Sequence, residues 1–279
     1  MYDNSMKLMH SATDLKTIVA PYEALIVDLW GVIHDGTALY PGVAQTLAYL
    51  HEAGKPVVFL SNAPRVSAKA REVLDRLGID RAHYIDIVTS GQVAHDLLAA
   101  DTDWLGTKYY YLGPGKDEDI LSDLADYTRV ATPEEADFVL NTGYEYDYQP
   151  HEEVLPTLKK LLAAKLPLLC VNPDHEVVKI DGTQMLCAGT LADEYADMGG
   201  EVEYIGKPFE DVYERAINLL GTDNVLCVGD NPLTDIIGAR EMEFDSLLIT
   251  GGILAIRGDE VDLEMIDPTH VLPGFGLAQ

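Results

Sequence analysis

The sequence lacks the features that place proteins in membranes or stabilise them outside the cell. No uninterrupted apolar run approaches the roughly 18 residues that a membrane-spanning helix needs. The opening residues MYDNSMKLMH lack the basic-then-apolar pattern of a secretory signal. The 3 cysteines, Cys170, Cys187 and Cys227, are widely spaced and form no CxxC metal pattern. We therefore expect reduced, buried thiols in a cytoplasmic protein that has no membrane partner.

Positive charge is also scarce. The chain has 19 Lys and Arg residues against 47 Asp and Glu residues, a formal net charge of -28. Such a field repels phosphate backbones and anionic lipids, which argues against nucleic acid or a membrane surface as the main partner. We interpret most of the charge as a solvated acidic surface. An anionic substrate then needs local positive charge, from a metal ion or a lysine.

Short runs of β-branched and apolar residues alternate with helical stretches, a pattern typical of an α/β fold with a parallel sheet. The runs that predict buried strands are Ala24 to Asp28, Pro56 to Ser61, Ile85 to Thr89, Tyr109 to Leu112, Phe138 to Asn141, Leu168 to Asn172, Val225 to Asp230 and Ser246 to Thr250. The stretches that predict helices are Val43 to Ala53, Ser67 to Leu77, Gln92 to Ala100, Glu152 to Ala164, Phe209 to Leu220 and Thr234 to Arg240.

The middle of the chain differs from its two ends. Residues 91–196 contain strands and helices of their own but few acidic residues directly after a strand. We interpret this stretch as an inserted α/β cap domain. Residues 1–90 and 197–279 then form the core.

Polar residues follow several of the predicted core strands. Asp28, the pair Ser61 and Asn62, and Asp230 each lie at or just after a strand end. In open α/β sheets, ligands bind at the carboxyl ends of the strands, where such side chains converge. Asp28 is a candidate nucleophile, and Ser61 and Asn62 are candidate phosphate ligands. Turn formation and helix capping are the alternative interpretations of all three.

Two further segments add charge. Lys207 precedes a predicted helix, where a cation is unfavourable for the helix dipole, so it makes better sense facing an anion. There it can neutralise both a nucleophilic carboxylate and a phosphoryl group. In VLCVGDNPLTDIIGAR, Asp230 and Asp235 offer the hard oxygen ligands that Mg²⁺ prefers. Stabilisation of the helix N-terminus is the alternative interpretation of Asp235.

The segments DLWGV, LSN, GKP and GDNPLTD, in this order along the chain, resemble the four motifs of the haloacid dehalogenase superfamily. GKP and the sequence NPD at Asn172 to Asp174 are similar to its class IIA branch, which includes pyridoxal phosphatase-like and nucleotide or sugar phosphatase-like enzymes. The resemblance covers nearly the whole chain. It implies a doubly wound, Rossmann-like parallel-sheet core with an inserted α/β cap of the C2 type, Mg²⁺ as the cofactor and a small phosphorylated metabolite as the partner.

By this resemblance Asp28 is the catalytic nucleophile, which forms an aspartyl-phosphate and also binds the metal. The backbone carbonyl of Trp30 and the carboxylate of Asp230 would complete the direct ligands, with Asp235 as an outer or accessory ligand. Lys207 would balance the charge during catalysis. The residues that the resemblance assigns to the phosphate are Ser61, Asn62 and Lys207.

Position 30 departs from the pattern of the family. In its phosphatases the residue two after the nucleophile is normally a second aspartate, which protonates the leaving group and then activates water. Here that residue is Trp30, and an indole is neither acid nor base near neutral pH. Losing such a group typically costs about 10² to 10⁴ in rate.

Three interpretations of Trp30 remain open. His34 or Asp35, just after the turn, takes over the proton transfer, although His34 is more simply explained as a packing or capping residue. Alternatively the protein is a slow phosphatase, or a metal and phosphate-ligand binding protein with vestigial catalysis. A minority alternative is a dehalogenase-type hydrolase, because the metal-free dehalogenases of the superfamily also carry an aromatic residue there. The acidic pair Asp230 and Asp235 and the C2-type cap argue against it.

The cap is expected to select the substrate. Asp174 and His175 lie where related enzymes bring a cap loop toward the active site, and together with His34 they are the candidate specificity residues. A simple Asn-Pro-Asp turn is the alternative. Another cap segment carries alternating tyrosines, for which packing within the cap or a cap-to-cap homodimer contact is favoured over stacking on a substrate ring. These residues are Tyr144, Tyr146 and Tyr148.

Overall fold

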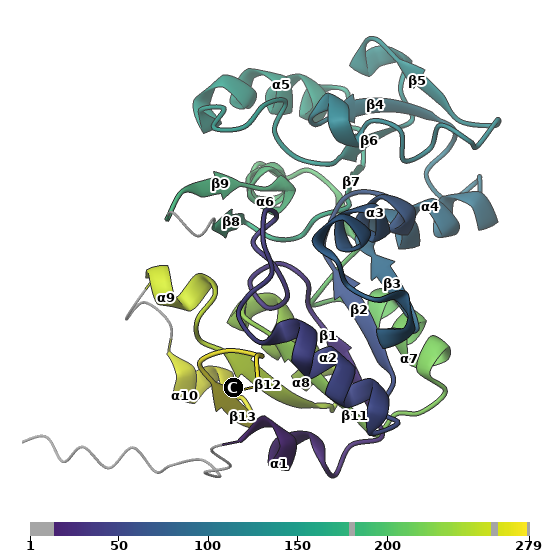
Figure 1. The fold of residues 1–279 in the computed structure, drawn as a ribbon. Helices are drawn as coiled ribbons and strands as arrows, with labels where there is room; N and C mark the ends of the chain where they lie inside the picture. The colour runs from purple at the N-terminus through teal and green to yellow at the C-terminus, as the bar shows by residue number, and fades with distance from the viewer. Residues whose placement is uncertain (1–13, 179–181, 258–261, 278–279) are drawn as a thin grey trace, which may run out of the picture.

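The core is built on one parallel sheet (Figure 1). The computed structural model describes residues 14–178, 182–257 and 262–277. The strand order of this sheet is β13-β12-β11-β1-β2-β3, with every neighbouring pair parallel. Its strands are β1 (Ala24–Val27), β2 (Val57–Ser61), β3 (Asp86–Thr89), β11 (Val225–Gly229), β12 (Asp245–Ile249) and β13 (His270–Leu272).

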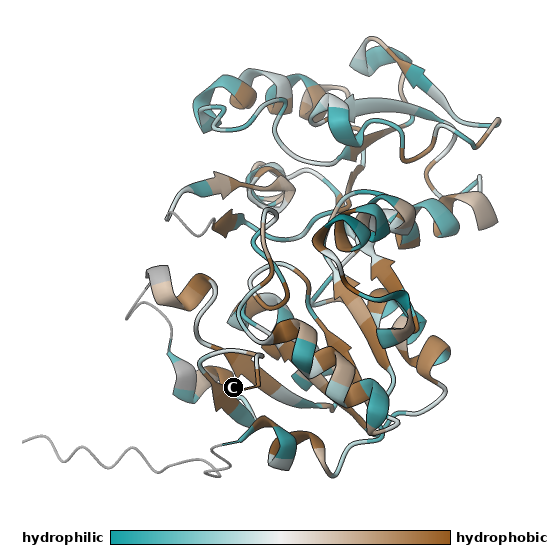
Figure 2. Cartoon of the chain, in the orientation of Figure 1, coloured by the Kyte–Doolittle hydropathy of each residue, from teal (hydrophilic) through white to brown (hydrophobic). Residues whose placement is uncertain are grey.

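Helices cover both faces of the core sheet, as in a doubly wound fold. Successive residues of β1 point to opposite faces: Leu25 and Val27 pack with helices α1, α2 and α3, whereas Ala24 and Ile26 pack with α4, α7 and α8. Because neither face meets water, the central strands are apolar throughout, and Figure 2 shows them in brown. The helices are α1 (Leu15–Val19), α2 (Val43–Glu52), α3 (Ser67–Leu77), α4 (Ser90–Ala100), α7 (Glu210–Leu220), α8 (Ile237–Glu241), α9 (Ile253–Arg257) and α10 (Leu263–Ile266).

A second parallel sheet forms the cap, which lies above the core in Figure 1. Its strand order is β10-β7-β6-β4-β5, and a separate antiparallel hairpin, β8–β9, lies on the side toward the core. The strands are β4 (Lys108–Leu112), β5 (Thr128–Val130), β6 (Phe138–Asn141), β7 (Leu168–Cys170), β8 (Glu176–Val178), β9 (Gln184–Leu186) and β10 (Val202–Tyr204). The cap helices are α5 (His151–Ala163) and α6 (Ala188–Asp197). Short 3₁₀ turns lie at Arg81–His83, Gly115–Asp117 and Pro133–Glu135.

The predicted fold class is confirmed, and every predicted strand and helix has a counterpart within about two residues.

The cap boundaries differ from the predicted 91–196. Helix α4 packs against β3 and α7 of the core, so the chain leaves the core near residue 100. At the other end, β10 pairs with β7 and keeps the chain in the cap sheet to Tyr204. The short sequence Val202–Tyr204 has a charged residue at its centre, which suits an edge strand but gives a weak sequence signal.

All three cysteines are buried and free, as expected for a chain without disulfides. Within the residues that the structure describes, no helix is long and apolar enough to cross a membrane.

Candidate active site

A cleft of about 920 Å³ lies between the carboxyl ends of the core strands and the cap. Strand β1 pairs with β11 on one side and with β2 on the other. The residues that follow or end these three strands, Asp28, Asp230 and Ser61, therefore meet at one edge of the sheet and line the cleft. The sequence placed them at strand ends, and the parallel register places them side by side.

Lys207 is the central cation of the site. Its Nζ donates hydrogen bonds to Asp28 Oδ1 and Asp235 Oδ1, each at 2.6 Å, and all three side chains are buried. Burial alone would lower the pKa of Lys207, but the carboxylates of Asp235 and Asp28 outweigh it and raise the pKa well above its ordinary value. The lysine therefore stays charged and holds the nucleophile candidate in one orientation.

Three carboxylates gather around this lysine. Ligand oxygens of Asp28, Asp230 and Asp235 all lie within 4.8 Å of one another. Burial and the neighbouring acids raise the pKa of Asp28 well above its usual range, although Lys207 opposes them, and burial together with Asp235 raises the pKa of Asp230 to about 7. A single lysine does not balance three buried carboxylates. The cluster fits a divalent cation, because three hard oxygen donors lie within reach of one ion and one lysine leaves negative charge unbalanced.

The backbone orients these acids. Asp230 Oδ2 accepts a hydrogen bond from the N–H of Ile253 at 2.7 Å, and Asp235 Oδ2 accepts one from the N–H of Asn231 at 3.0 Å. Asp235 lies in a π-helical turn, Pro232–Ile236, that precedes α8. Gly31 has a φ of +85°, and a Cβ there would lie 2.0 Å from Asp230 Oδ2. A glycine after position 30 therefore lets the turn that follows Asp28 approach Asp230 closely.

Asn62 connects three parts of the site. Its Oδ1 accepts the backbone N–H of Lys207 at 2.7 Å, and its Nδ2 donates to the carbonyl of Lys207 at 3.0 Å and to Asp174 Oδ1 at 3.1 Å. The side chain thus fixes the backbone that carries Lys207 and holds a cap loop against the core. Ser61 lines the cleft, and its Oγ accepts the N–H of Ala63 at 3.3 Å.

The two cap residues predicted to face the substrate lie in different places. The Asp174 carboxyl lies in the main cleft, where burial raises its pKa, an effect that Lys207 opposes. His175 instead lines a smaller cavity of about 330 Å³, where its Nε2 hydrogen-bonds Asp193 Oδ2 at 2.8 Å.

His34 and Asp35 hold the turn after the nucleophile. His34 is buried and does not line the cleft; its Nδ1 accepts the N–H of Gly36 at 3.0 Å. Burial lowers the pKa of His34 to about 4, against the opposing effect of Asp35. Burial alone would raise the pKa of Asp35, but hydrogen bonds from Ala38 and Thr37 outweigh it and lower the pKa. His34 is thus placed for packing, away from the cleft, whereas Asp35 lines the cleft and also accepts hydrogen bonds within the turn.

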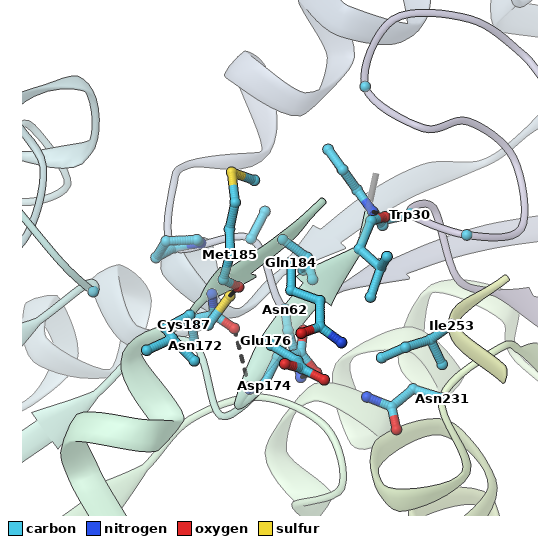
Figure 3. Close-up of a pocket in the computed structure, with 18 of the residues that line it drawn as sticks. Trp30, Asn62, Asn172, Asp174, Glu176, Gln184, Met185, Cys187, Asn231 and Ile253 are labelled. Atoms are coloured by element: carbon cyan, nitrogen blue, oxygen red, sulfur yellow. Dashed lines mark hydrogen bonds between the residues drawn. The ribbon is translucent and has the colours of Figure 1, made fainter. Parts of the chain in front are cut away.

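The hairpin β8–β9 contributes site residues that the sequence analysis did not single out. Glu176, Gln184 and Met185 line the cleft from the cap (Figure 3), and Trp30 and Ile253 face them from the core. A signal was present, since EVVKIDGTQML contains an Asp-Gly pair between two short alternating runs, a pattern that predicts a hairpin.

Comparison with known proteins agrees with this geometry. Residues 25–125 match a family model described as haloacid dehalogenase-like hydrolase, and residues 204–278 match one described as HAD-hydrolase-like. The two matches together span well over half of the chain. The chain belongs to the haloacid dehalogenase-like hydrolases. This confirms the predicted resemblance, including its class IIA branch.

Full-length relatives support the assignment. Ribonucleotide monophosphatase NagD of Escherichia coli is 26% identical over 258 residues, which cover 89% of this chain and 95% of NagD. An acid sugar phosphatase of Staphylococcus aureus is 25% identical over 261 residues, which cover 89% of this chain and 93% of that protein. The crystal structure of a haloacid dehalogenase-like hydrolase from Brucella suis is 29% identical, with a TM-score of 0.83 over 94% of this chain and 98% of that one.

Proposed function

We propose that the protein is a Mg²⁺-dependent hydrolase of a small phosphate monoester that acts through an aspartyl-phosphate on Asp28. The observation that carries this proposal is the buried Lys207 bridge between Asp28 and Asp235 at the carboxyl edge of the core sheet. The names of NagD and the acid sugar phosphatase, which are matched over most of their lengths, support phosphate monoesters as the substrate class.

The metal ligands in this proposal are the carboxylates of Asp28 and Asp230 and the backbone carbonyl of Trp30, with Asp235 as an accessory ligand. The clustering of three acids around one lysine supports this assignment. A bound Mg²⁺ supplies positive charge that stabilises the phosphoryl oxygens. Lys207 contributes the same kind of stabilisation from the protein.

The reaction has two steps on this carboxylate. A carboxylate oxygen of Asp28 attacks phosphorus, the bond between phosphorus and the ester oxygen breaks, and the leaving alcohol takes a proton from solvent. Water then attacks the phosphorus of the aspartyl-phosphate, which releases inorganic phosphate and restores Asp28. In the proposal, the Ser61 hydroxyl and the backbone N–H of Asn62 bind the phosphate oxygens.

Trp30 sets the expected rate. Position 30 carries an indole in place of a carboxylate. The usual acid for protonating the leaving group and the usual base for activating water are therefore missing there. We propose a slow enzyme that favours activated leaving groups, with the second step slower than the first, because proton transfer typically contributes about 10² to 10⁴ in rate.

Product release during the first turnover tests this mechanism. The purified protein is mixed with Mg²⁺ and 4-nitrophenyl phosphate, and 4-nitrophenolate is followed in a rapid-mixing spectrometer. We expect a burst equal to the enzyme concentration, followed by a slow phase. Asp28→Asn should abolish the burst, whereas Asp123→Asn, at an exposed cap residue, should keep it. Full activity in Asp28→Asn would disprove the nucleophile assignment.

A non-catalytic role is the second candidate, and the indole at position 30 is the observation that favours it. In that case Mg²⁺ and inorganic phosphate raise the thermal stability of the protein while a broad panel of phosphate esters gives no turnover. A dehalogenase-type reaction has less support, because three clustered carboxylates suit a metal-dependent reaction better than a metal-free one.

A further inference from the structure

The indole at position 30 joins the core to the cap. Trp30 Nε1 donates a hydrogen bond of 3.0 Å to the carbonyl oxygen of Val178, the last residue of β8, across 148 positions of sequence. Trp30, the hairpin residue Gln184 and the core residue Ile253, all labelled in Figure 3, line the same pocket. The residue that replaces an acid therefore makes a specific contact between the two halves of the cleft.

The same cap residue is held a second time by its side chain. Val178 is buried in an apolar cluster with Ile236, Leu248 and Ile253, which all belong to the core. One residue of the hairpin is thus held through both its carbonyl and its side chain. Because β8 pairs with β9 in antiparallel register, with Val178 opposite Gln184, this attachment also positions the second strand.

The turn after the nucleophile presents the indole. Gly36 packs so closely on the ring that a Cβ there would lie 2.7 Å from Trp30 Cζ3, and its φ of +90° suits glycine. The ring of His34 stands edge-on to the indole, with the centroids 6.0 Å apart. Two residues of the core turn therefore orient the indole, and the cap carbonyl meets a donor that is already in place.

We propose that Trp30 is a positioning residue, which anchors the β8–β9 hairpin of the cap over the nucleophile and so builds the wall of the cleft that receives the leaving group. The hairpin side chains at this wall are Glu176, Gln184 and Met185. Together with the indole they fit a leaving alcohol that carries hydrogen-bonding groups and an apolar face. The leaving-group part of this proposal rests on the phosphatase function; the anchoring does not.

Hydrogen exchange tests the anchor without any need for turnover. In Trp30→Phe the aromatic ring remains but the N–H donor is lost. We expect peptides that cover β8 and β9 to exchange about fivefold faster than in the wild type, the effect of losing one hydrogen bond. Peptides from β6 and β7 should be unchanged. Trp104→Phe, at the only other tryptophan of the chain, is the matched control and should leave the hairpin protected.

Kinetics separate an anchor from a residue with a merely structural role. With 4-nitrophenyl phosphate, Trp30→Phe should raise KM about fivefold and change kcat by less than about twofold, since the nucleophile and Lys207 are untouched. Trp30→Asp restores a carboxylate but removes the anchor, so we expect faster hairpin exchange and no gain in turnover.

Two results would overturn the proposal. One is unchanged hairpin exchange in Trp30→Phe. The other is a large gain in turnover for Trp30→Asp with hairpin protection intact. That result would mean that position 30 only lacks its usual acid and does not anchor the hairpin. If the wild-type protein has no turnover at all, the proposed phosphatase function fails, while the exchange result still decides whether Trp30 anchors the cap.

Discussion

The two walls of the cleft are built in opposite ways. On the core wall, Asp28, Lys207 and Asp235 are almost fully buried and every one of them is paired. On the cap wall, Tyr146 and Tyr148 keep 48% and 57% of their surface exposed although both line the cleft. Rigid, desolvated charges suit phosphoryl transfer, which needs preorganised electrostatics. Exposed side chains on loops suit recognition, because they tolerate change without loss of the fold.

This contrast predicts that substitutions on the core wall alter both stability and chemistry, whereas those on the cap wall alter binding. The most severe case is Lys207→Ala, which leaves buried carboxylates without their cation. We expect the free energy of unfolding to fall by about 3 to 5 kcal/mol in metal-free buffer, and the first-turnover burst to disappear. Urea denaturation measures the first effect. The control is Lys159→Ala, on the exposed side of α5, which should change the free energy of unfolding by less than about 0.5 kcal/mol. An equal loss of stability in both variants would contradict the special role of the buried lysine.

The pH dependence of stability and the substitution Asp230→Asn test whether the core wall carries excess negative charge. Its folded pKa, about 7, lies above the ordinary value of 3.8, so the folded protein binds this proton more tightly than the unfolded chain. Metal-free stability should therefore fall as pH rises from about 4 to 7. At pH 8 we expect Asp230→Asn to be more stable than the wild type by about 4 kcal/mol without metal.

Added Mg²⁺ should reverse that order, because the wild-type protein gains stability from the ion and Asp230→Asn gains less. Thermal unfolding with chelator and with Mg²⁺ gives both values. Equal stabilisation of the two proteins by Mg²⁺ would argue against Asp230 as a ligand.

The acid sensitivity of His34 variants tests whether this side chain is buried neutral in the turn beneath the core wall. Its folded pKa, about 4, lies below the ordinary 6.5, so only the unfolded chain is protonated between these values and stability falls as pH drops through this window. We expect His34 to account for about 2 kcal/mol of the loss at pH 5. His34→Gln retains an acceptor for the Gly36 N–H and should lose less stability on acidification, whereas the exposed His51→Gln should behave like the wild type. Identical acid sensitivity in all three would contradict the burial argument.

The smallest stability effect is expected on the cap wall. Tyr146→Ala combined with Tyr148→Ala should change the free energy of unfolding by less than about 0.5 kcal/mol, because both residues are largely exposed. If they stack on a substrate ring, KM rises about two- to tenfold at constant kcat, and Tyr146→Phe keeps the wild-type value. If they form a cap-to-cap dimer instead, light scattering shows a smaller particle for the double variant.

Most elements that place the chemistry were predictable from local sequence. The buried strands are continuous apolar runs, and Asp28, Ser61 and Asp230 stand at their ends, so the rule for parallel sheets was enough to bring them together. Most of the three-residue strands, namely β5, β8, β9, β10 and β13, were missed because so short a segment has little periodicity. Helix α6 was missed as well, although its buried Leu191, Ala192 and Tyr195 recur at helical spacing.

The sequence by itself determined the candidate catalytic edge of this protein, because each residue proposed to act there is tied to the end of an apolar strand or the start of a helix. The tertiary structure decided what the remaining residues do. Trp30 meets Val178 across 148 positions, and His34 is buried beneath the turn while Asp174 enters the cleft. Such roles depend on burial and on long-range contacts, which arise only when the cap packs on the core.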